Sequence, residues 1–293
     1  MHRMRNDAAA VLILAGLLAV PALAQAPPSF PPGQLDQLVS RIALYPDPLL
    51  AQILAAATYP NDIPAAAQWA DQHHYLSGQA LAGAIAEDQL PWEPPVQALL
   101  PFPSVLDMMN GDMNWTTQVG NAFLAQQLDV MDAVQRQRVL AQRYGYLRSN
   151  AQIVVGGGPF ITIMPFNPAF IVVPYYDPAI VFFAPRSGFM IAGAIRFGFG
   201  VGIGGFFAPW GWGGGGIRFD WGAHAVFLNN ERWGRTWANR ASYVHPYPAV
   251  RRPAPGVMRP AEGHPLESRS EAERTAARQG KAAPRETHKG RGK

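Results

Sequence analysis

The chain of 293 residues contains no cysteine. This absence excludes disulfide bonds, thiolate nucleophiles and cysteine-bound zinc or iron–sulfur clusters. It also excludes a lipid anchor on a cysteine behind a cleaved leader. Lysine is nearly as scarce, since all three lysines lie between residues 281 and 293. Charged residues make up 15% of the chain and hydrophobic residues 48%, so the composition predicts a folded protein with a large core.

Several catalytic motifs are also missing. The sequence contains no G-x-S-x-G or S-x-x-K nucleophile motif and no H-E-x-x-H zinc motif. The glycine triplet at 156–158 is followed by Pro159 and Phe160, and not by the lysine and hydroxyl residue of a phosphate-binding loop. The sequence therefore predicts neither a nucleotide ligand nor a cofactor.

The first 24 residues have the pattern of a signal peptide. Two arginines precede the apolar run 11–20, and a proline then leads to the small-residue site Ala22-Leu23-Ala24. A membrane-spanning helix needs roughly 20 apolar residues, about twice the length of this run, which makes an uncleaved anchor the weaker alternative. We expect cleavage after Ala24 and export, most simply to a periplasm, where nucleic acid is not an available partner.

Composition divides the chain into five parts. They are a signal peptide (1–24), a proline-rich leader (25–33), a helical domain (34–150), a β, glycine-rich and aromatic module (151–247) and a basic tail (248–293). Net charge follows this division, with −6 over 34–150, +3 over 151–250 and +6 over 251–293. The tail has few apolar residues, which predicts disorder. Its cations favour an anionic membrane surface or an acidic glycan, although a purely solubilising tail fits equally.

The domain at 34–150 reads as short helices joined by proline corners, which is typical of an orthogonal bundle. Asp47 is a good N-cap before Pro48, and serines occupy the same position before later helices. The expected helices cover 34–43, 49–59, 61–74, 78–88, 96–100 and 105–110. Residues 114–144 then form either one long, coiled-coil-like helix of about 30 residues or two helices.

Beyond residue 151 the apolar pattern shortens to that of strands. We expect strands at 153–155, 160–164, 169–173 and 179–183, separated by Gly- and Pro-containing turns, in a small antiparallel sheet. The fold class is therefore α+β. The segment 188–210 is apolar or glycine apart from Arg196 and Pro209, which allows two interpretations. It is either a glycine-rich segment packed on the sheet or a membrane span, with Gly198/Gly202-type spacing for helix packing.

Several blocks of this sequence occur together in a known family. They are LDQLVSRIALYPDPLLAQILAAATYPNDI (35–63), QWADQH (68–73), PWEPPVQALLPFPSVLDMM (91–109), NWTTQVGNAFLAQQLDVMDAVQRQR (114–138) and IVVPYYDPAIVF (171–182). The chain resembles the exported bacterial family called domain of unknown function 3300, over about 34–183 and up to about 243. Leu128 departs from the pattern, which has two acidic residues at 128 and 129. The resemblance implies an envelope protein with a helical module followed by a β module, and it implies no catalytic residue.

Two constellations could carry chemistry. Asp47 and Asp177 both follow a tyrosine and stand beside prolines, so they could form a carboxylate pair for glycan hydrolysis if the fold brought them together. The alternative is that Asp47 caps a helix and Asp177 starts a turn. Asp71 and His74 lie three residues apart on an expected helix and could bind a metal, but no third ligand is evident nearby. The alternative for this pair is a polar helix end.

A set of tryptophans is the candidate binding surface, either for sugar rings or for a protein partner. The alternative is a small β core. The set consists of Trp210, Trp212, Trp221, Trp233 and Trp237. We therefore predict an exported envelope protein that binds or scaffolds a protein or glycan partner without catalysis. Two rival hypotheses remain, an envelope glycan or peptide hydrolase that uses carboxylates and a membrane-embedded protein through 188–210.

Overall fold

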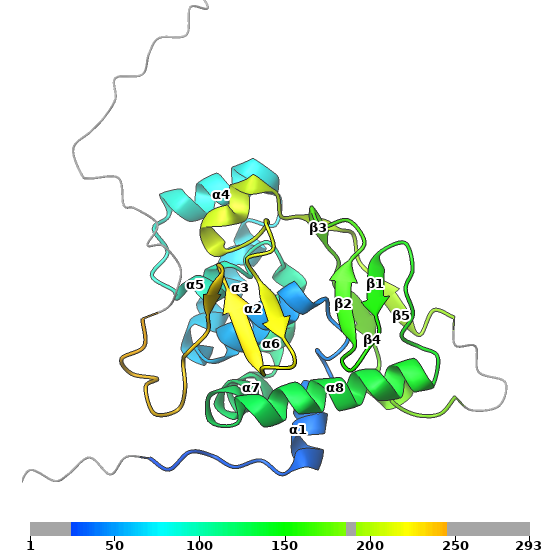
Figure 1. Cartoon of the computed structure of the whole chain (residues 1–293). Helices are drawn as coiled ribbons and strands as arrows, with labels where there is room; N and C mark the ends of the chain where they lie inside the picture. The colour runs from blue at the N-terminus through cyan, green and yellow to red at the C-terminus, as the bar shows by residue number, and fades with distance from the viewer. Residues whose placement is uncertain (1–24, 186–191, 245–293) are drawn as a thin grey trace, which may run out of the picture. The chain divides into compact units, whose positions relative to one another are not determined.

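The computed structural model describes residues 25–185 and 192–244. The predicted signal peptide and basic tail, and residues 188–191 of the glycine-rich segment, lie outside these ranges. The α+β class is confirmed, with a helical half followed by small antiparallel sheets (Figure 1).

Eight helices form the N-terminal half of the described chain. They are α1 (Pro32–Val39), α2 (Asp47–Ala57), α3 (Ile63–Gln72), α4 (Gly78–Glu87), α5 (Pro94–Gln97), α6 (Pro103–Gly111), α7 (Met113–Ala125) and α8 (Gln127–Arg143), with a 3₁₀ turn at Pro60–Asp62. Proline stands in the first turn of α1, α2, α3, α5 and α6, because a missing N–H and a fixed φ are tolerated there. Of the two alternatives for residues 114–144, the structure shows two helices, α7 and α8, which divide at Gln126.

The α2 helix lies at the centre of the fold. Every residue of α2 except Pro48 is buried. It contacts α5 and α7 on the helical side and β2, β7 and β8 on the other. The strands β7 (Arg218–Asp220), β8 (Ala225–Leu228) and β9 (Glu231–Arg232) form one antiparallel sheet, drawn in yellow and orange over α2 in Figure 1. The helices and sheets thus share one hydrophobic core.

Three two-stranded sheets make up the rest of the β half. The strand β1 (Ile153–Gly156) pairs with β2 (Thr162–Pro165), β3 (Phe170–Ile171) with β6 (Val201–Gly202), and β4 (Pro174–Tyr176) with β5 (Ile195–Phe197), all antiparallel. The predicted strand at 179–183 is wrong. A short helix, α9 (Pro178–Val181), occupies it, because the Asp177 side chain accepts a hydrogen bond from the Ala179 N–H and Pro178 favours the first helical position.

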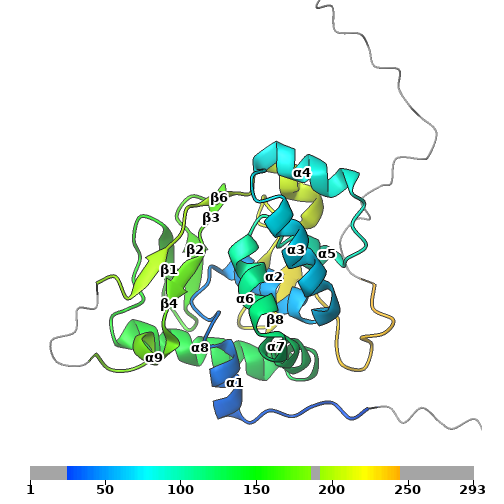
Figure 2. The same ribbon diagram turned by 180° about the vertical axis from the view of Figure 1, so that it is seen from behind.

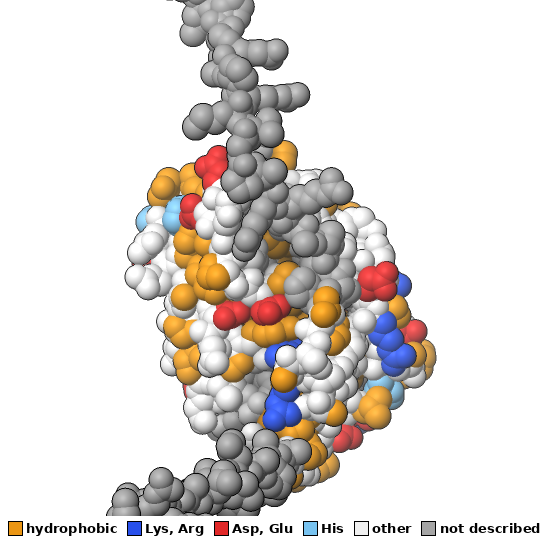
Figure 3. All heavy atoms as spheres, turned by 90° about the vertical axis from the view of Figure 1, so that its left-hand side faces the viewer, with side chains coloured by type: hydrophobic (Ala, Val, Ile, Leu, Met, Phe, Trp, Pro, Cys, Tyr) orange, Lys and Arg blue, Asp and Glu red, His pale blue; other side chains and the backbone are white. Residues whose placement is uncertain are grey.

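The described part of the glycine-rich segment contains strands β5 and β6 and a 3₁₀ helix, η2 (Gly205–Trp210). Ile203, Phe207 and Trp210 anchor it to the core. Among the described residues, no helix has the length and hydropathy needed to cross a membrane. The spacing of Gly198 and Gly202 therefore belongs to extended chain and not to a helix. Figure 3 shows the face on the left of Figure 1, where a few charged groups lie among hydrophobic and uncharged side chains.

Candidate functional site

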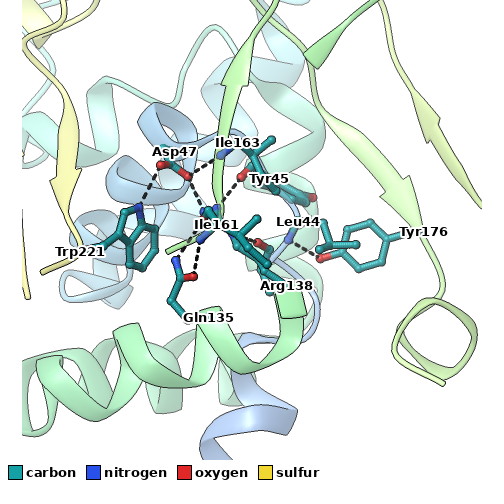
Figure 4. A network of polar contacts seen from close by, with 10 residues as sticks. Leu44, Tyr45, Asp47, Gln135, Arg138, Ile161, Ile163, Tyr176 and Trp221 are labelled. Carbon is teal, nitrogen blue, oxygen red and sulfur yellow. Dashed lines mark hydrogen bonds and ion pairs between the residues drawn. The ribbon is translucent and has the colours of Figure 1, made fainter. Parts of the chain in front are cut away.

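A buried ion pair links helices α2 and α8 at the centre of the fold (Figure 4). Arg138 Nη1 lies 2.6 Å from Asp47 Oδ1. The Arg138 side chain is fully buried and that of Asp47 is 5% exposed. Asp47 stands at the start of α2 rather than at its N-cap, which is Pro46, and its carboxylate makes no capping hydrogen bond. It turns away from its own helix to meet α8.

Backbone carbonyls satisfy the rest of the guanidinium. Arg138 donates from Nε to the Ala43 carbonyl at 2.8 Å, from Nη1 to the Ile161 carbonyl at 2.9 Å, and from Nη2 to the Tyr45 carbonyl at 3.1 Å. Two of these carbonyls belong to the corner between α1 and α2, so this one side chain fixes the corner. A buried charge is tolerated because it is both paired and hydrogen-bonded.

The same carboxylate ties in two sheets. The Trp221 indole N–H donates to Asp47 Oδ2 at 3.1 Å, and the Ile163 N–H donates to Oδ1 at 3.3 Å. The guanidinium carbon of Arg138 lies 4.9 Å from the centre of the Trp221 ring, which adds a cation–π contact. Asp47 therefore joins α2 to α8, β2 and the turn after β7, and both of its oxygens are engaged.

The two candidate carboxylates have separate partners. Asp47 is held in the buried network, and the exposed Asp177 caps α9 with its Oδ1. The sequence left open whether the fold brings the two aspartates together as a carboxylate pair. The partners of each side chain are other residues: Arg138, Trp221 and Ile163 for Asp47, and Ala179 for Asp177. The interpretation of Asp177 as a residue with a local backbone role fits this geometry.

A cleft opens beside the same corner. Its lining residues come from α6 and the segment after α1 and from β4, α9 and β5. Figure 2 shows where α1, α6, α9 and β4 lie in the fold. Its volume is about 710 Å³, within the range of small-molecule sites. We call it the tyrosine cleft because three tyrosines line it. Its lining includes Arg41, Tyr45, Ser104, Tyr175, Tyr176, Asp177 and Arg196.

Of the tyrosines that line the cleft, Tyr45 is buried and Tyr176 is partly buried. Burial raises the pKa of the Tyr45 hydroxyl, and the nearby Tyr175 hydroxyl raises it further. Burial likewise raises the pKa of Tyr176, whose hydroxyl donates to the Ser40 carbonyl at 2.8 Å and accepts from the Leu44 N–H at 3.3 Å. These phenols are neutral at physiological pH, so they present rings and hydroxyls but no charge.

The two arginines of the cleft differ in availability. Arg41 pairs with Asp112 at 2.9 Å and lies 5.2 Å from the centre of the Trp115 ring. Arg196 is exposed, and within residues 25–185 and 192–244 its guanidinium has no ion pair. The lining of the cleft thus contains one arginine that is held in an ion pair, one exposed arginine without an ion pair, and neutral tyrosine rings.

The candidate tryptophans are mostly structural. Trp210, Trp212, Trp221 and Trp233 are each 5% exposed or less. The indole N–H of Trp210 donates to Gln97 and that of Trp212 to the Ala98 carbonyl, at 2.9 and 2.8 Å. Their rings fill the space between helices and sheets and do not form an outer face. This arrangement matches the β-core alternative.

Trp237 is partly exposed, and it holds the leader. Its indole N–H donates to the Gln25 carbonyl at 2.8 Å, and its backbone N–H donates to the Leu124 carbonyl at 2.8 Å. The Phe30 N–H also donates to the Gln126 side chain, at 2.6 Å. The proline-rich leader is therefore fastened at both ends to the junction of α7 and α8.

Asp71 and His74 lie at the C-terminal end of α3, where Nδ1 of His74 is 2.5 Å from the Asp71 carbonyl oxygen. The ring nitrogen thus contacts the backbone of its own helix. No group of three or more histidine, aspartate or glutamate side chains in the described ranges could hold a metal ion together.

Comparison with known proteins places the chain in a family. Residues 31–187, which include α1 to α9 and strands β1 to β4, match the model of the protein family of unknown function DUF3300. The chain belongs to the DUF3300 family. This DUF3300 chain is also 35% identical over 211 residues to the uncharacterised protein YacH of Escherichia coli K12. That alignment covers 60% of this chain and 34% of YacH, so the chain spans about a third of its relative. No solved structure matches this chain.

Two features of this DUF3300 chain were missed in the sequence. Arg138, which the sequence analysis did not single out, falls on the apolar stripe of α8, four residues after the buried Val134. That position was the available signal for burial. Nothing comparable marked Tyr175 and Arg196, because their neighbourhood depends on strand pairing between distant segments.

Proposed function

We propose that this DUF3300 protein is an exported, non-enzymatic binding protein of the cell envelope that holds its partner in the tyrosine cleft. The cleft carries the proposal. Segments between residues 41 and 196 meet around one space of about 710 Å³, with aromatic rings, a hydroxyl and an accessible guanidinium. Concave sites with apolar walls and few polar groups are typical of ligand binding.

The buried network supports binding over catalysis. The Asp47 carboxylate accepts hydrogen bonds from Arg138, Trp221 and Ile163, and the pair with Arg138 closes the corner between α1 and α2. A general acid or nucleophile has to reach a substrate, and this carboxylate is 5% exposed. The geometry therefore favours a scaffold role for Asp47 over the hydrolase alternative.

The sequence supports export. The charged start, the short apolar run and the small-residue site are ordered as in a cleaved signal peptide. Cell fractionation and mass spectrometry of the mature protein test this point. We expect a mature chain that begins at Gln25. It should either fractionate with the periplasm or bind membranes through its basic tail, in which case high salt should release it. A chain that keeps Met1 and stays cytoplasmic would contradict export.

Co-sedimentation with purified murein sacculi and with outer-membrane vesicles tests binding. The variant Ser104→Trp places a large ring in the cleft and should abolish co-sedimentation. Ser77→Trp is the matched control, because Ser77 is exposed, lies outside the cleft and makes no capping hydrogen bond. Binding that survives Ser104→Trp, or wild-type protein that sediments with neither fraction, would refute the proposal.

A further inference from the structure

A long two-stranded ribbon forms the outer wall of the tyrosine cleft. The pairs β3–β6 and β4–β5 follow one another along the same two segments, 169–176 and 195–203. Between the two pairs, the Gly198 N–H donates to the Val173 carbonyl at 3.0 Å. Beyond β3 and β6, the Ile203 N–H donates to the Ala169 carbonyl at 2.9 Å and extends the ribbon at its other end. Two residues on one strand face three on the other between these pairs, which makes a bulge at 198–200.

Glycines at alternate positions make room for aromatic rings on this ribbon. A Cβ on Gly198 would lie 3.2 Å from the Tyr175 ring, and a Cβ on Gly200 would lie 3.3 Å from the Phe170 side chain. Because neither glycine carries a side chain, positions 198 and 200 form a strip of bare backbone beside these two side chains. Tyr175 and Phe170 lie against this strip and are each 46% exposed. The ribbon thus presents aromatic rings backed by glycine.

A cation stands next to one of these rings. Arg196 is directly opposite Tyr175 in the strand register. Arg196 is exposed and has no ion pair among the described residues. The exposed Asp177 follows β4, and Asp177 and Ser104 of α6 both belong to the lining of the same cleft. The lining of the cleft therefore contains an exposed aromatic ring, a guanidinium without an ion pair among the described residues, and oxygens that can accept hydrogen bonds from hydroxyl groups.

We infer that the pair of Tyr175 and Arg196 binds an acidic glycan, a sugar chain that carries carboxylates; this inference rests on the binding function proposed above. The C–H face of a pyranose ring packs well on an exposed aromatic ring. The planar guanidinium of Arg196 binds a carboxylate through two parallel hydrogen bonds. The oxygens of Asp177 and Ser104 accept hydrogen bonds from sugar hydroxyls. An acidic peptide would use the cation but has no ring face for Tyr175.

Isothermal titration calorimetry on the full mature chain tests the inference. The probes are trigalacturonic acid, its methyl ester, which keeps the rings and removes the charges, and triglutamate, which keeps the charges without rings. We expect trigalacturonic acid to bind at least about tenfold more tightly than its methyl ester, because one charge-assisted hydrogen bond is worth about that factor. It should also bind more tightly than triglutamate, because triglutamate has no ring face to pack on Tyr175. Equal or tighter binding of triglutamate, or no binding of trigalacturonic acid, overturns the assignment.

Matched variants locate the site. Arg196→Gln should weaken the binding of trigalacturonic acid about tenfold or more. Tyr175→Ala should weaken the binding of both trigalacturonic acid and its methyl ester. Arg232→Gln and Tyr75→Ala are the controls, since these residues are also exposed but lie outside the cleft. Unchanged binding in Arg196→Gln overturns the inference. If Ser104→Trp abolishes binding to envelope fractions while trigalacturonic acid does not bind, the proposed function stands and only the ligand class fails.

Discussion

Removal of Arg138 should cost more stability than removal of any surface cation. The variant Arg138→Met fills most of the volume but leaves the Asp47 carboxylate buried without its counter-ion, and it frees three backbone carbonyls. Breaking a buried pair from one side costs about 3–5 kcal/mol. For a domain of this size, that loss corresponds to a fall in Tm of about 6–20 °C. Much of the marginal stability of an average domain would be lost.

Urea unfolding followed by tryptophan fluorescence measures this loss, since Trp221 lies against Arg138. Arg136→Met is the control on the same helix. Arg136 pairs with Asp36 at 2.8 Å, but the two side chains are 43% and 29% exposed, so its loss should cost less than about 1 kcal/mol. A free energy of unfolding for Arg138→Met within about 1 kcal/mol of wild type would refute the reasoning.

A double variant separates the buried charge from simple packing. Asp47→Asn combined with Arg138→Met removes both charges, so no uncompensated carboxylate remains in the core. We expect the double variant to be more stable than Arg138→Met alone, which is the opposite of additive losses. If the two losses add, the network acts through packing and not through charge.

Three further predictions concern other parts of the fold. Gly120→Ala should destabilise by about 1–3 kcal/mol in urea unfolding despite its better helix propensity, because a Cβ there would overlap the Ala57 carbonyl of α2; an unchanged midpoint would contradict that contact. The pKa of Asp112, measured by NMR titration, should lie below its ordinary value, chiefly because the carboxylate accepts a hydrogen bond from the Trp115 backbone N–H. Arg41→Gln should therefore raise this pKa only part of the way toward the ordinary value. Burial raises the pKa of Tyr176 in the folded protein, so its contribution to stability is complete below about pH 10 and falls above it. Tyr176→Phe should therefore make the free energy of unfolding less sensitive to pH above about pH 10.

The helical half was predictable because its signals are local. Prolines in first turns and apolar stripes place most of the helices to within a few residues. The short apolar run at 179–183 was misassigned because periodicity cannot separate strand from helix over five residues. The capping hydrogen bond of Asp177 decides that case, and it was visible only as an Asp-Pro pair.

The site was harder to predict because it depends on distant contacts. A spacing of four residues, as between Gly198 and Gly202, fits one face of a strand as well as one face of a helix, and only the pairing with β3 and β4 decides. The tryptophans illustrate the same limit. Aromatic side chains suit both a core and a binding face, and their burial here follows from packing against α2 and α5.

The central place of α2 also determines when the chain can finish folding. Asp47 and its partner Trp221 are 174 residues apart in sequence. During synthesis from the N-terminus, α2 is therefore made long before the strands that cover it. Until those strands are made, the nearly all-apolar surface of α2 stays uncovered. Contacts of such long range slow folding and prolong the exposure of aggregation-prone surface. The final closure of this core is thus a late event that waits for β7 and β8, so chains truncated before residue 218 should be captured by chaperones and degraded.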